Sequence, residues 1–148
     1  MHPQIHINFL AVAVAVITSF LFGWLWYGPL FGKKWAELMG IKMTEDCKPD
    51  PKVMMRGMII TLIGNFLTVY VLAHSTEVWR ASVWGVGADG PNYMYGFYAG
   101  FFTWLGFYVP MALGSVAWEM KSWKLFGLNT VFNFINLQIV GMILACWR

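Results

Sequence analysis

Charged side chains are scarce in this chain. Only 11% of its 148 residues are Asp, Glu, Lys or Arg, whereas 59% are hydrophobic, and the formal net charge is +3. A soluble domain carries about 25% charged residues, so the composition excludes an ordinary soluble domain and indicates a protein surrounded by lipid. The excess of positive charge is too small to predict nucleic-acid binding.

Cysteine is also rare, with two residues in the chain. Cys47 and Cys146 form no C-x-x-C motif, and the apolar runs between them place them on opposite sides of a membrane. The sequence therefore predicts two unpaired thiols and excludes a disulfide framework.

Carboxylates, lysine and arginine are missing from the middle of every long apolar run. Each run has the length of about 20 residues that crosses a hydrocarbon layer of about 30 Å. The sequence predicts an all-α membrane protein, a single domain of four transmembrane helices in an antiparallel bundle, with spans at residues 5–27, 53–73, 94–118 and 125–147. The missing intramembrane charge argues against a proton-coupled antiporter or a voltage sensor, and the lack of deep histidines argues against haem.

The first run ends in an abrupt change from apolar to charged sequence. Phe20–Trp35 reads FLFGWLWYGPLFGKKW, where aromatic rings flank Pro29 and two lysines follow. Tryptophan and tyrosine gather at membrane interfaces, and proline removes a helix donor. The run is longer than that of a cleaved signal sequence, so we interpret it as a retained span, with Lys33, Lys34 and Trp35 on lipid headgroups.

Two connecting segments suit short helices lying on the membrane surface. Residues 34–43 place apolar side chains opposite charged ones, although a solvated loop explains the same pattern. Residues 76–84 form the second segment, before a glycine-rich stretch. Trp79 and Trp84 within it are the residues that we expect to contact a partner protein.

Two prolines predict local features of the helices. Asp50 and Pro51 have the pattern of a helix start, with aspartate as N-cap and proline at the first helical position. Pro110 lies inside the third run, where it removes one backbone bond and predicts a kink near Gly106.

Basic residues are distributed unevenly among the connections. Arg80 and Arg148 lie on one side of the predicted bundle, and the other side holds Lys33, Lys34, Lys42, Lys48, Lys52, Arg56, Lys121 and Lys124. Lysine and arginine favour the cytoplasmic side of a membrane. We therefore expect a multi-pass membrane protein whose first and third connections face the cytoplasm, with both chain ends on the outer side.

Four segments of the chain resemble a known bacterial family. They read LWYGPLFGKKWAELMG, TVYVLAH, WLGFYVP and LFGLNTVFNFINLQIVGMIL. The most specific element is similar to W-Y-x-P-L-x-F-G-K-x-W, with one residue fewer between Pro29 and Phe31. That family of small four-span membrane proteins is catalogued only as a domain of unknown function, so the resemblance implies an inner-membrane protein and no activity. Its relatives often carry histidine in place of Asn133, so the resemblance does not support histidine-dependent chemistry here.

Uncharged polar side chains recur at helical spacing inside the runs. Amides and hydroxyls that face lipid lose hydrogen bonds at a cost of several kcal/mol, so we expect them to face protein. Those of the second and fourth runs are expected to meet as a polar seam. Two interpretations are open: contacts that set helix register, or a binding pocket or solute path. The residues are Thr18, Ser19, Thr61, Asn65, Thr68, Asn129, Asn133 and Asn136.

Two further patterns each leave two interpretations open. Gly96, Gly100 and Gly106 give the third run a small-residue face, which suits packing within the molecule or homo-oligomerisation. The outer side also holds three histidines, which are either isolated interfacial residues or weak candidates for a metal site: His2, His6 and His74.

These features favour a non-enzymatic membrane protein that acts through helix contacts, as a homo-oligomer or an accessory subunit of a larger membrane complex. The lipid bilayer is its first partner, and we expect no cofactor and no nucleic acid. The alternative is a small permease or lipid-handling protein with an intramembrane pocket lined by amides. A metal-dependent membrane enzyme that uses the outer histidines is a third hypothesis.

Overall fold

The computed structural model describes residues 5–41 and 50–147. All regular structure in those residues is helical. Four helical segments are long and apolar enough to cross a membrane, namely Phe9–Leu30, Pro51–Val78, Asn92–Trp118 and Trp123–Cys146. The predicted all-α architecture with four spans is confirmed.

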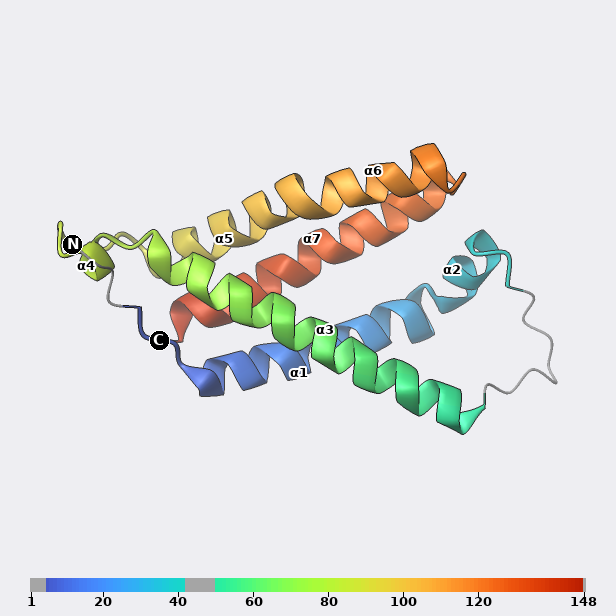
Figure 1. Ribbon diagram of the computed structural model, residues 1–148, viewed down its shortest axis with the longest axis horizontal. Helices are drawn as coiled ribbons and strands as arrows, with labels where there is room; N and C mark the ends of the chain where they lie inside the picture. Colours follow the sequence, from blue (N-terminus) through green and yellow to red (C-terminus); the bar gives the residue numbers. More distant parts are fainter. Residues whose placement is uncertain (1–4, 42–49, 148) are drawn as a thin grey trace.

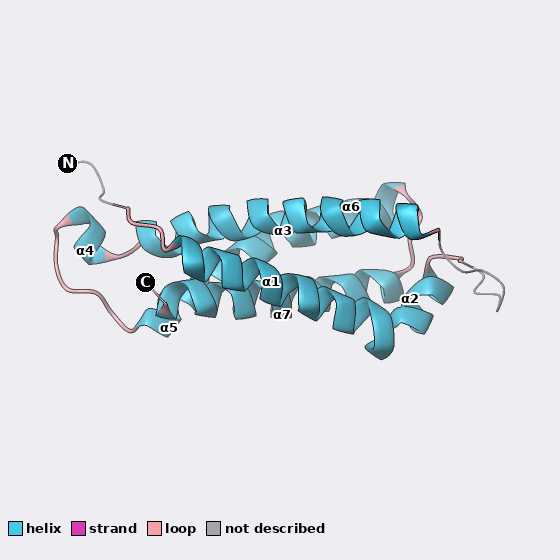
Figure 2. Ribbon diagram, turned by 90° about the horizontal axis from the view of Figure 1, so that it is seen from below, coloured by secondary structure: helices cyan, strands magenta, loops and turns pink. Residues whose placement is uncertain are grey.

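The elements follow one another as an up-and-down bundle (Figure 1). The start of α1, the end of α7 and α4 lie at one end, which we call the α4 end, and α2 and the α6–α7 turn lie at the other, the α2 end (Figure 2). The four spans therefore alternate in direction. In chain order the elements are α1 (Phe9–Leu25), η1 (Trp26–Leu30), α2 (Gly32–Leu38), α3 (Pro51–Val78), α4 (Ala81–Trp84), α5 (Asn92–Thr103), η2 (Trp104–Tyr108), α6 (Val109–Trp118) and α7 (Trp123–Cys146).

Side-chain caps set where three of the spans begin. Asn8 Oδ1 accepts hydrogen bonds of 3.0 and 3.2 Å from first-turn amides of α1, so this helix starts later than residue 5. Asp50 accepts a bond of 2.8 Å from the α3 backbone and Pro51 is the first helical residue, which confirms the predicted helix start. Ser122 caps α7 through a bond of 3.2 Å. Caps of this kind satisfy amide groups that have no partner within the helix.

Two π-helical turns interrupt the spans beside prolines. The first, η1, contains Pro29, and Gly28 within it has non-helical dihedral angles of −103° and −105°. The second, η2, surrounds Gly106 and leads into α6, where Pro110 stands in the first turn. A proline removes one helical hydrogen bond, and a wider turn absorbs the loss. The third span is therefore irregular at the point where its sequence predicts a kink.

The two predicted short helices differ from expectation in their bounds. The first is present as α2, and the chain turns at Gly40 with φ of +73°; the last residues of the predicted range 34–43 lie outside the described part. The second, 76–84, is divided. Helix α3 continues through Val78, Arg80 has an extended backbone with ψ of 133°, and only α4 follows as a separate turn.

The packed core lies in the half of the bundle nearer the α4 end. Helix α7 is central, because it contacts α1, α3, α5 and α6. The residues that α3 contributes to the core all come from its second half. The buried apolar residues of this core are Ala11, Val12, Ala15, Val69, Leu72, Ala73, Ala99, Leu137, Val140 and Leu144.

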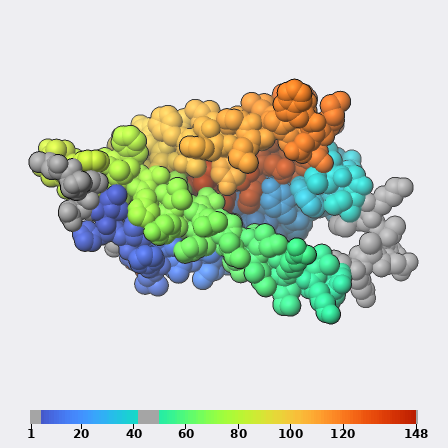
Figure 3. Space-filling model, viewed as in Figure 1, coloured from blue at the N-terminus to red at the C-terminus, as the bar shows by residue number. Residues whose placement is uncertain are grey.

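The first half of α3 stands away from the other helices. Every residue from 51 to 64 is exposed, although the span is apolar. In Figure 3 the green atoms of α3 run diagonally across the molecule, with blue and cyan atoms of α1 and α2 above their right-hand half. Lipid tails are as apolar as leucine, so exposed apolar side chains here are compatible with a membrane. The unusual feature is an exposed polar side chain inside the span, such as Thr61.

Candidate functional site

A lateral cleft separates the first half of α3 from α1 and α7. It has a volume of about 650 Å³, and we call it the α1–α3 cleft. Its walls are mainly apolar and aromatic, and three uncharged polar side chains, Ser19, Thr61 and Asn65, face into it. The sequence predicts these three as intramembrane polar residues, but it does not indicate that a cleft opens beside them.

The three polar side chains of the cleft have no hydrogen bond within the described residues. Thr68, Thr103 and Thr130 also have no side-chain hydrogen bond among the described residues, whereas the four other Ser and Thr hydroxyls of the spans donate to a carbonyl of their own helix. The pairs are Thr18 to Val14 at 2.8 Å, Ser75 to Val71 at 3.2 Å, Thr76 to Ala73 at 2.8 Å and Ser115 to Ala112 at 2.8 Å. Ser19, Thr61 and Asn65 are therefore available to hydrogen-bond a molecule in the cleft.

Asn65 lies at the middle of a span. Helix α3 has 28 residues, and Asn65 is near its midpoint. At about 1.5 Å per residue, roughly 20 Å of helix lies on either side. Water does not reach this depth of a bilayer, and an unsatisfied polar group there costs several kcal/mol. An occupant of the cleft that offers hydrogen-bonding atoms would remove this cost.

Aromatic contacts hold the wall of the cleft that is opposite α3. Tyr27 donates a hydrogen bond of 3.0 Å from its hydroxyl to Asn129 Oδ1 on α7. The Phe132 ring of α7 packs edge-on against Tyr27, with centroids 4.8 Å apart, and Trp35 of α2 packs on the other side of Tyr27 at 5.9 Å. These contacts join η1, α2 and α7 into one wall of the cleft, whereas α3 forms the other.

The predicted polar seam is distributed over separate places. Ser19, Thr61 and Asn65 line the α1–α3 cleft, and Asn129 and Asn133 line a second cavity of about 260 Å³ between α6 and α7. Within the described part of the chain no hydrogen bond joins the polar side chains of α3 to those of α7. These side chains do not meet because the first half of α3, which contains Thr61, diverges from α7.

The remaining seam residues are more enclosed. Asn133 Nδ2 donates to the Asn129 carbonyl oxygen at 2.8 Å, which is a contact within α7. Asn136 is buried, and its Oδ1 atom has no hydrogen-bond partner among the described residues. Thr68 is half-buried on α3. Asn136 stands one turn beyond Phe132 and so on the same face of α7.

The small-residue face of the third span is only partly used. A Cβ atom at Gly96 would lie 2.5 Å from the carbonyl oxygen of Gly141, and one at Gly100 would lie 2.8 Å from that of Leu137. Both glycines therefore allow α5 and α7 to approach closely. Gly106 has open space around it and takes no part in this contact.

The predicted headgroup residues lie at the α2 end. Lys33 is exposed, and Lys34 forms an ion pair of 2.9 Å with Glu37. The hydrogen bond from Lys34, with its charge, lowers the pKa of the Glu37 carboxyl. Trp35 is half-buried and lines the α1–α3 cleft.

The predicted partner residues lie at the α4 end, together with His6 and His74. Trp79 is 77% exposed beside a third cavity of about 430 Å³, whereas the Trp84 ring donates a bond of 2.7 Å to the Val78 carbonyl. His74 packs edge-on against Tyr70. In residues 5–41 and 50–147 no group of three His, Cys, Asp or Glu is placed to hold a metal; His2 and Cys47 lie outside these ranges.

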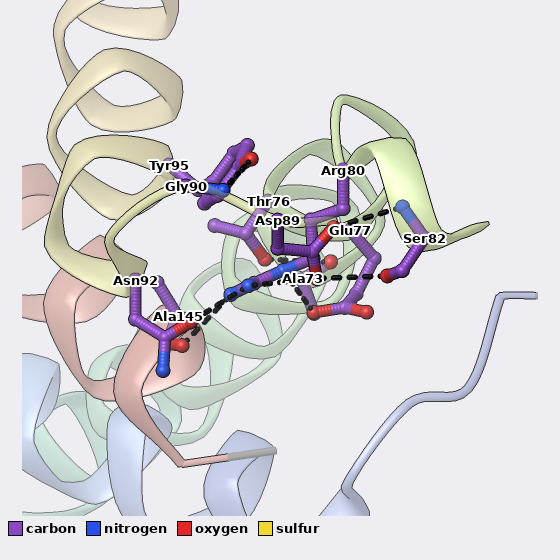
Figure 4. A network of polar contacts seen from close by, with 10 residues as sticks. All are labelled: Ala73, Thr76, Glu77, Arg80, Ser82, Asp89, Gly90, Asn92, Tyr95 and Ala145. Atoms are coloured by element: carbon purple, nitrogen blue, oxygen red, sulfur yellow. Dashed lines mark hydrogen bonds and ion pairs between the residues drawn. The ribbon is translucent and has the colours of Figure 1, made fainter. Parts of the chain in front are cut away.

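A buried ionic cluster at the α4 end is centred on Arg80 (Figure 4). The Arg80 side chain is fully buried, and its Nε atom lies 2.9 Å from Glu77 Oε1. A second carboxylate, that of Asp89, lies 3.7 Å from the guanidinium. Asp89 also accepts bonds of 2.8 and 2.7 Å from Ser82, which fixes the connection after α4.

Neutral groups complete the surroundings of the guanidinium. Arg80 donates hydrogen bonds of 2.8 Å to Asn92 Oδ1 and of 2.8 Å to the Ala145 carbonyl, and its charge lies 4.5 Å from the centre of the Tyr95 ring. These contacts join the ends of α3 and α7 to the start of α5. The Arg80 cluster, consisting of Arg80, Glu77, Asp89, Asn92 and Tyr95, therefore fastens the α4 end of the bundle.

Comparison with known proteins identifies the family of the chain. The family model described as "Protein of unknown function (DUF1761)" matches residues 10–145. The chain belongs to the DUF1761 family. The match covers the α1–α3 cleft and the Arg80 cluster, and it confirms the resemblance inferred from the sequence. No curated protein and no solved structure matches the chain.

Sequence reasoning missed several residues of this family member. Met54, Gly57 and Met58 line the cleft but give no signal, because apolar residues on a span are expected whether they face lipid or protein. Arg80 was assigned only to the outer connection. The sequence contains a signal for the Arg80 ion pair, because Glu77 and Arg80 are three residues apart within the predicted helix 76–84, and this is the spacing of an ion pair on a helix.

Proposed function

We propose that this protein is a non-enzymatic, multi-pass membrane protein that binds an amphiphile in the α1–α3 cleft. The observation that carries the proposal is the set of three polar side chains without hydrogen bonds, Ser19, Thr61 and Asn65, in an otherwise apolar cleft. The cleft volume of about 650 Å³ lies within the range of about 300–1,000 Å³ that ligand pockets occupy. Ligand pockets typically have a mainly apolar lining with a small number of polar groups that point to the same place.

The bilayer is the source of the amphiphile in this proposal. The cleft is bordered by exposed residues of α3, so a molecule enters it sideways from the lipid. Met54 and Met58 on that border have flexible side chains that adapt to chains of different shape. The hydroxyls of Ser19 and Thr61 and the Asn65 amide donate to ester, carbonyl or hydroxyl oxygens of the ligand.

The lining favours binding over catalysis. The described residues around the cleft include no carboxylate, imidazole or thiol. The Ser19 and Thr61 hydroxyls are nucleophiles only when a neighbouring base activates them, and the described lining offers no carboxylate or imidazole for that role. The distribution of lysine and arginine supports an orientation with the α2 end on the cytoplasmic side, and the family resemblance is the reason for which we propose a bacterial inner membrane.

A second candidate function is assembly, as a homo-oligomer or an accessory subunit of a membrane complex. Gly57, Thr61, Gly64 and Thr68 follow one face of α3 that adjoins the cleft, and a Cβ atom at either glycine would meet nothing within 4 Å. A small-residue face of this kind lets another transmembrane helix approach closely. In this case a helix from a partner occupies the cleft.

The double variant Thr61→Val/Asn65→Leu tests the proposed function. It removes two hydrogen-bonding side chains from the cleft without placing a charge there. Each hydrogen bond contributes about 1 kcal/mol, and 1.4 kcal/mol is a factor of ten. We therefore expect at least tenfold weaker binding of the amphiphile, measured as the bound fraction in native mass spectra after gentle detergent extraction.

Thr18→Val is the matched control for this experiment. It removes a hydroxyl from the same bundle, but that hydroxyl donates to Val14 on its own helix. The control should keep the bound molecule. A wild-type protein that carries no small molecule but has the mass of an oligomer, and that becomes monomeric in the double variant, would support assembly and contradict amphiphile binding.

A further inference from the structure

We infer that the cavity between α6 and α7 is a water-binding site inside the membrane, supplied with water from the α2 end. This α6–α7 cavity has a volume of about 260 Å³, whereas one water molecule occupies about 30 Å³ in the liquid. It therefore has room for several water molecules. The water site is a separate feature from the α1–α3 cleft, and it does not depend on what the cleft binds.

The cavity begins close to the end of the bundle. Ser115 of α6 lines it three residues before that helix ends at Trp118, and Phe126 of α7 lines it three residues after that helix begins at Trp123. Three residues are about 4.5 Å of helix. Trp118 and Trp123 are both exposed, and tryptophan is enriched at membrane interfaces. Interfacial water therefore lies close to this part of the lining.

The other end of the cavity lies deep in the span. Asn133 lines the cavity ten residues after the start of α7, which is about 15 Å of helix. The hydrocarbon layer of a membrane is about 30 Å thick. The cavity therefore extends from near the α2 end to about the middle of the bilayer.

Three residues of α7 leave hydrogen-bonding atoms unpaired beside this cavity. Asn133 Nδ2 donates to the Asn129 carbonyl, and Asn129 Oδ1 accepts from Tyr27, but within the described residues neither Asn133 Oδ1 nor Asn129 Nδ2 has a partner. Neither of these two atoms is enclosed by protein. Thr130 is 7% exposed, and its Oγ1 atom also lacks a described partner. Water both donates and accepts hydrogen bonds, so it suits this mixed set of groups.

A lipid acyl chain suits the cavity less well than water does. A chain would pack on the apolar part of the lining, but it would leave the polar groups of Asn129, Thr130 and Asn133 without partners. Each unsatisfied polar group in hydrocarbon costs several kcal/mol. Polar cavities that offer about two to four partners for each molecule hold water, whereas apolar cavities stay dry. The polar side chains of α7 therefore favour water as the occupant.

The water site meets the wall of the α1–α3 cleft at one hydrogen bond. Asn129 lines the α6–α7 cavity and Tyr27 lines the cleft, and the Tyr27 hydroxyl donates to Asn129 Oδ1 at 3.0 Å. Water bound to Asn129 and a molecule in the cleft therefore lie on opposite sides of this pair. The Tyr27–Asn129 hydrogen bond separates a hydrated space from one that is open to lipid.

The test places a cysteine at either of two neighbouring residues of α6, in the full-length chain with Cys47→Ser and Cys146→Ser. Ala112 lines the cavity, whereas Leu113 is 41% exposed and is not part of the lining. Leu113 is also one residue nearer the end of α6, so depth alone would favour reaction of the control. Each protein in nanodiscs is treated with sulfonatoethyl methanethiosulfonate, an anion that does not enter hydrocarbon, and its modification rate is measured by intact mass.

We expect Ala112→Cys to react at least about tenfold faster than Leu113→Cys, because the thiolate is the reactive form and apolar surroundings raise the pKa of a thiol. Adding Thr130→Val/Asn133→Leu should lower the rate of Ala112→Cys to that of Leu113→Cys, because an apolar cavity stays dry. Equal rates for the two single cysteines would overturn the inference. A fast Ala112→Cys rate that the added substitutions leave unchanged would overturn it as well.

Water-edited solid-state NMR of the wild-type protein provides a measurement that needs no substitution. The Ala112 methyl group lies six residues from the end of α6, and the control is the methyl group of Ala13, an exposed residue four residues inside α1. Ala112 is therefore the deeper of the two, by about 3 Å of helix. Magnetisation from water should nevertheless reach Ala112 faster than Ala13. Equal or slower transfer to Ala112 contradicts a hydrated α6–α7 cavity.

Discussion

Replacing Arg80 by leucine is expected to lower the free energy of unfolding by about 3–5 kcal/mol. The guanidinium is fully buried and lies 2.9 Å from Glu77, which is itself only 5% exposed. The substitution removes the guanidinium that faces this carboxylate and, at 3.7 Å, the carboxylate of Asp89. Breaking a buried ion pair on one side is among the most destabilising single changes.

Reversible unfolding in mixed micelles, followed by far-ultraviolet circular dichroism, measures this effect. Arg56→Leu is the matched control, because Arg56 is an exposed arginine of α3, the helix that precedes Arg80, and should change stability by less than about 0.5 kcal/mol. Arg80→Lys should lower the free energy of unfolding by an amount between those of Arg80→Leu and Arg56→Leu, because lysine keeps the positive charge but not the several hydrogen-bond donors of the guanidinium. A loss below about 1 kcal/mol for Arg80→Leu would show that the cluster does not fasten the α4 end.

Gly96→Ala is expected to destabilise the protein by about 1–3 kcal/mol, the usual cost of overpacking. The added methyl group would lie 2.5 Å from the carbonyl oxygen of Gly141 and 3.0 Å from the Ala145 side chain. Backbone atoms cannot rotate away as a side chain does, so α5 and α7 must separate. The same unfolding measurement detects the change.

Gly114→Ala is the matched control for this substitution. Gly114 is a helical glycine of the same span, and a Cβ atom there would meet nothing within 4 Å. Alanine should be neutral or stabilising by up to about 1 kcal/mol at such a position. Equal effects of the two substitutions would mean that the close contact between α5 and α7 does not form in the membrane.

The spans of this protein could be predicted because length, charge and proline determine them. Four apolar runs of membrane length leave few alternatives, and Asp50 with Pro51 marks a helix start through ordinary capping chemistry. The irregular helix around Gly106 follows from Pro110 for the same local reason. Each of these features depends on residues that are close together in the sequence.

The α1–α3 cleft could not be predicted because lipid and protein interiors are equally apolar. In a soluble protein an exposed helix half shows polar residues, whereas residues 51–64 of α3 remain mostly apolar although every one is exposed. The polar side chains Thr61 and Asn65 were recognised, but not where they point. Their placement depends on how far α3 diverges from α7, which is a tertiary property.

The Arg80 cluster shows a second limit of the sequence. Counting Arg80 among the charges of a connection is sufficient for an orientation argument, but it does not reveal that the side chain is fully buried. The cluster also contains Asn92 and the Ala145 carbonyl, which come from segments distant in the chain. Only the folded arrangement brings these groups together.

Binding of a membrane amphiphile in the α1–α3 cleft is the central claim, and photolabelling tests it most directly. A phosphatidylglycerol with a photoreactive group on its acyl chain is incorporated into membranes that contain the wild-type protein, and labelled residues are mapped by peptide mass spectrometry. The account predicts that the label concentrates on the facing segments 19–27 and 54–65 and decreases at least tenfold in Thr61→Val/Asn65→Leu. Label spread evenly over all four spans, or gathered beside Trp79 at the α4 end, would contradict it.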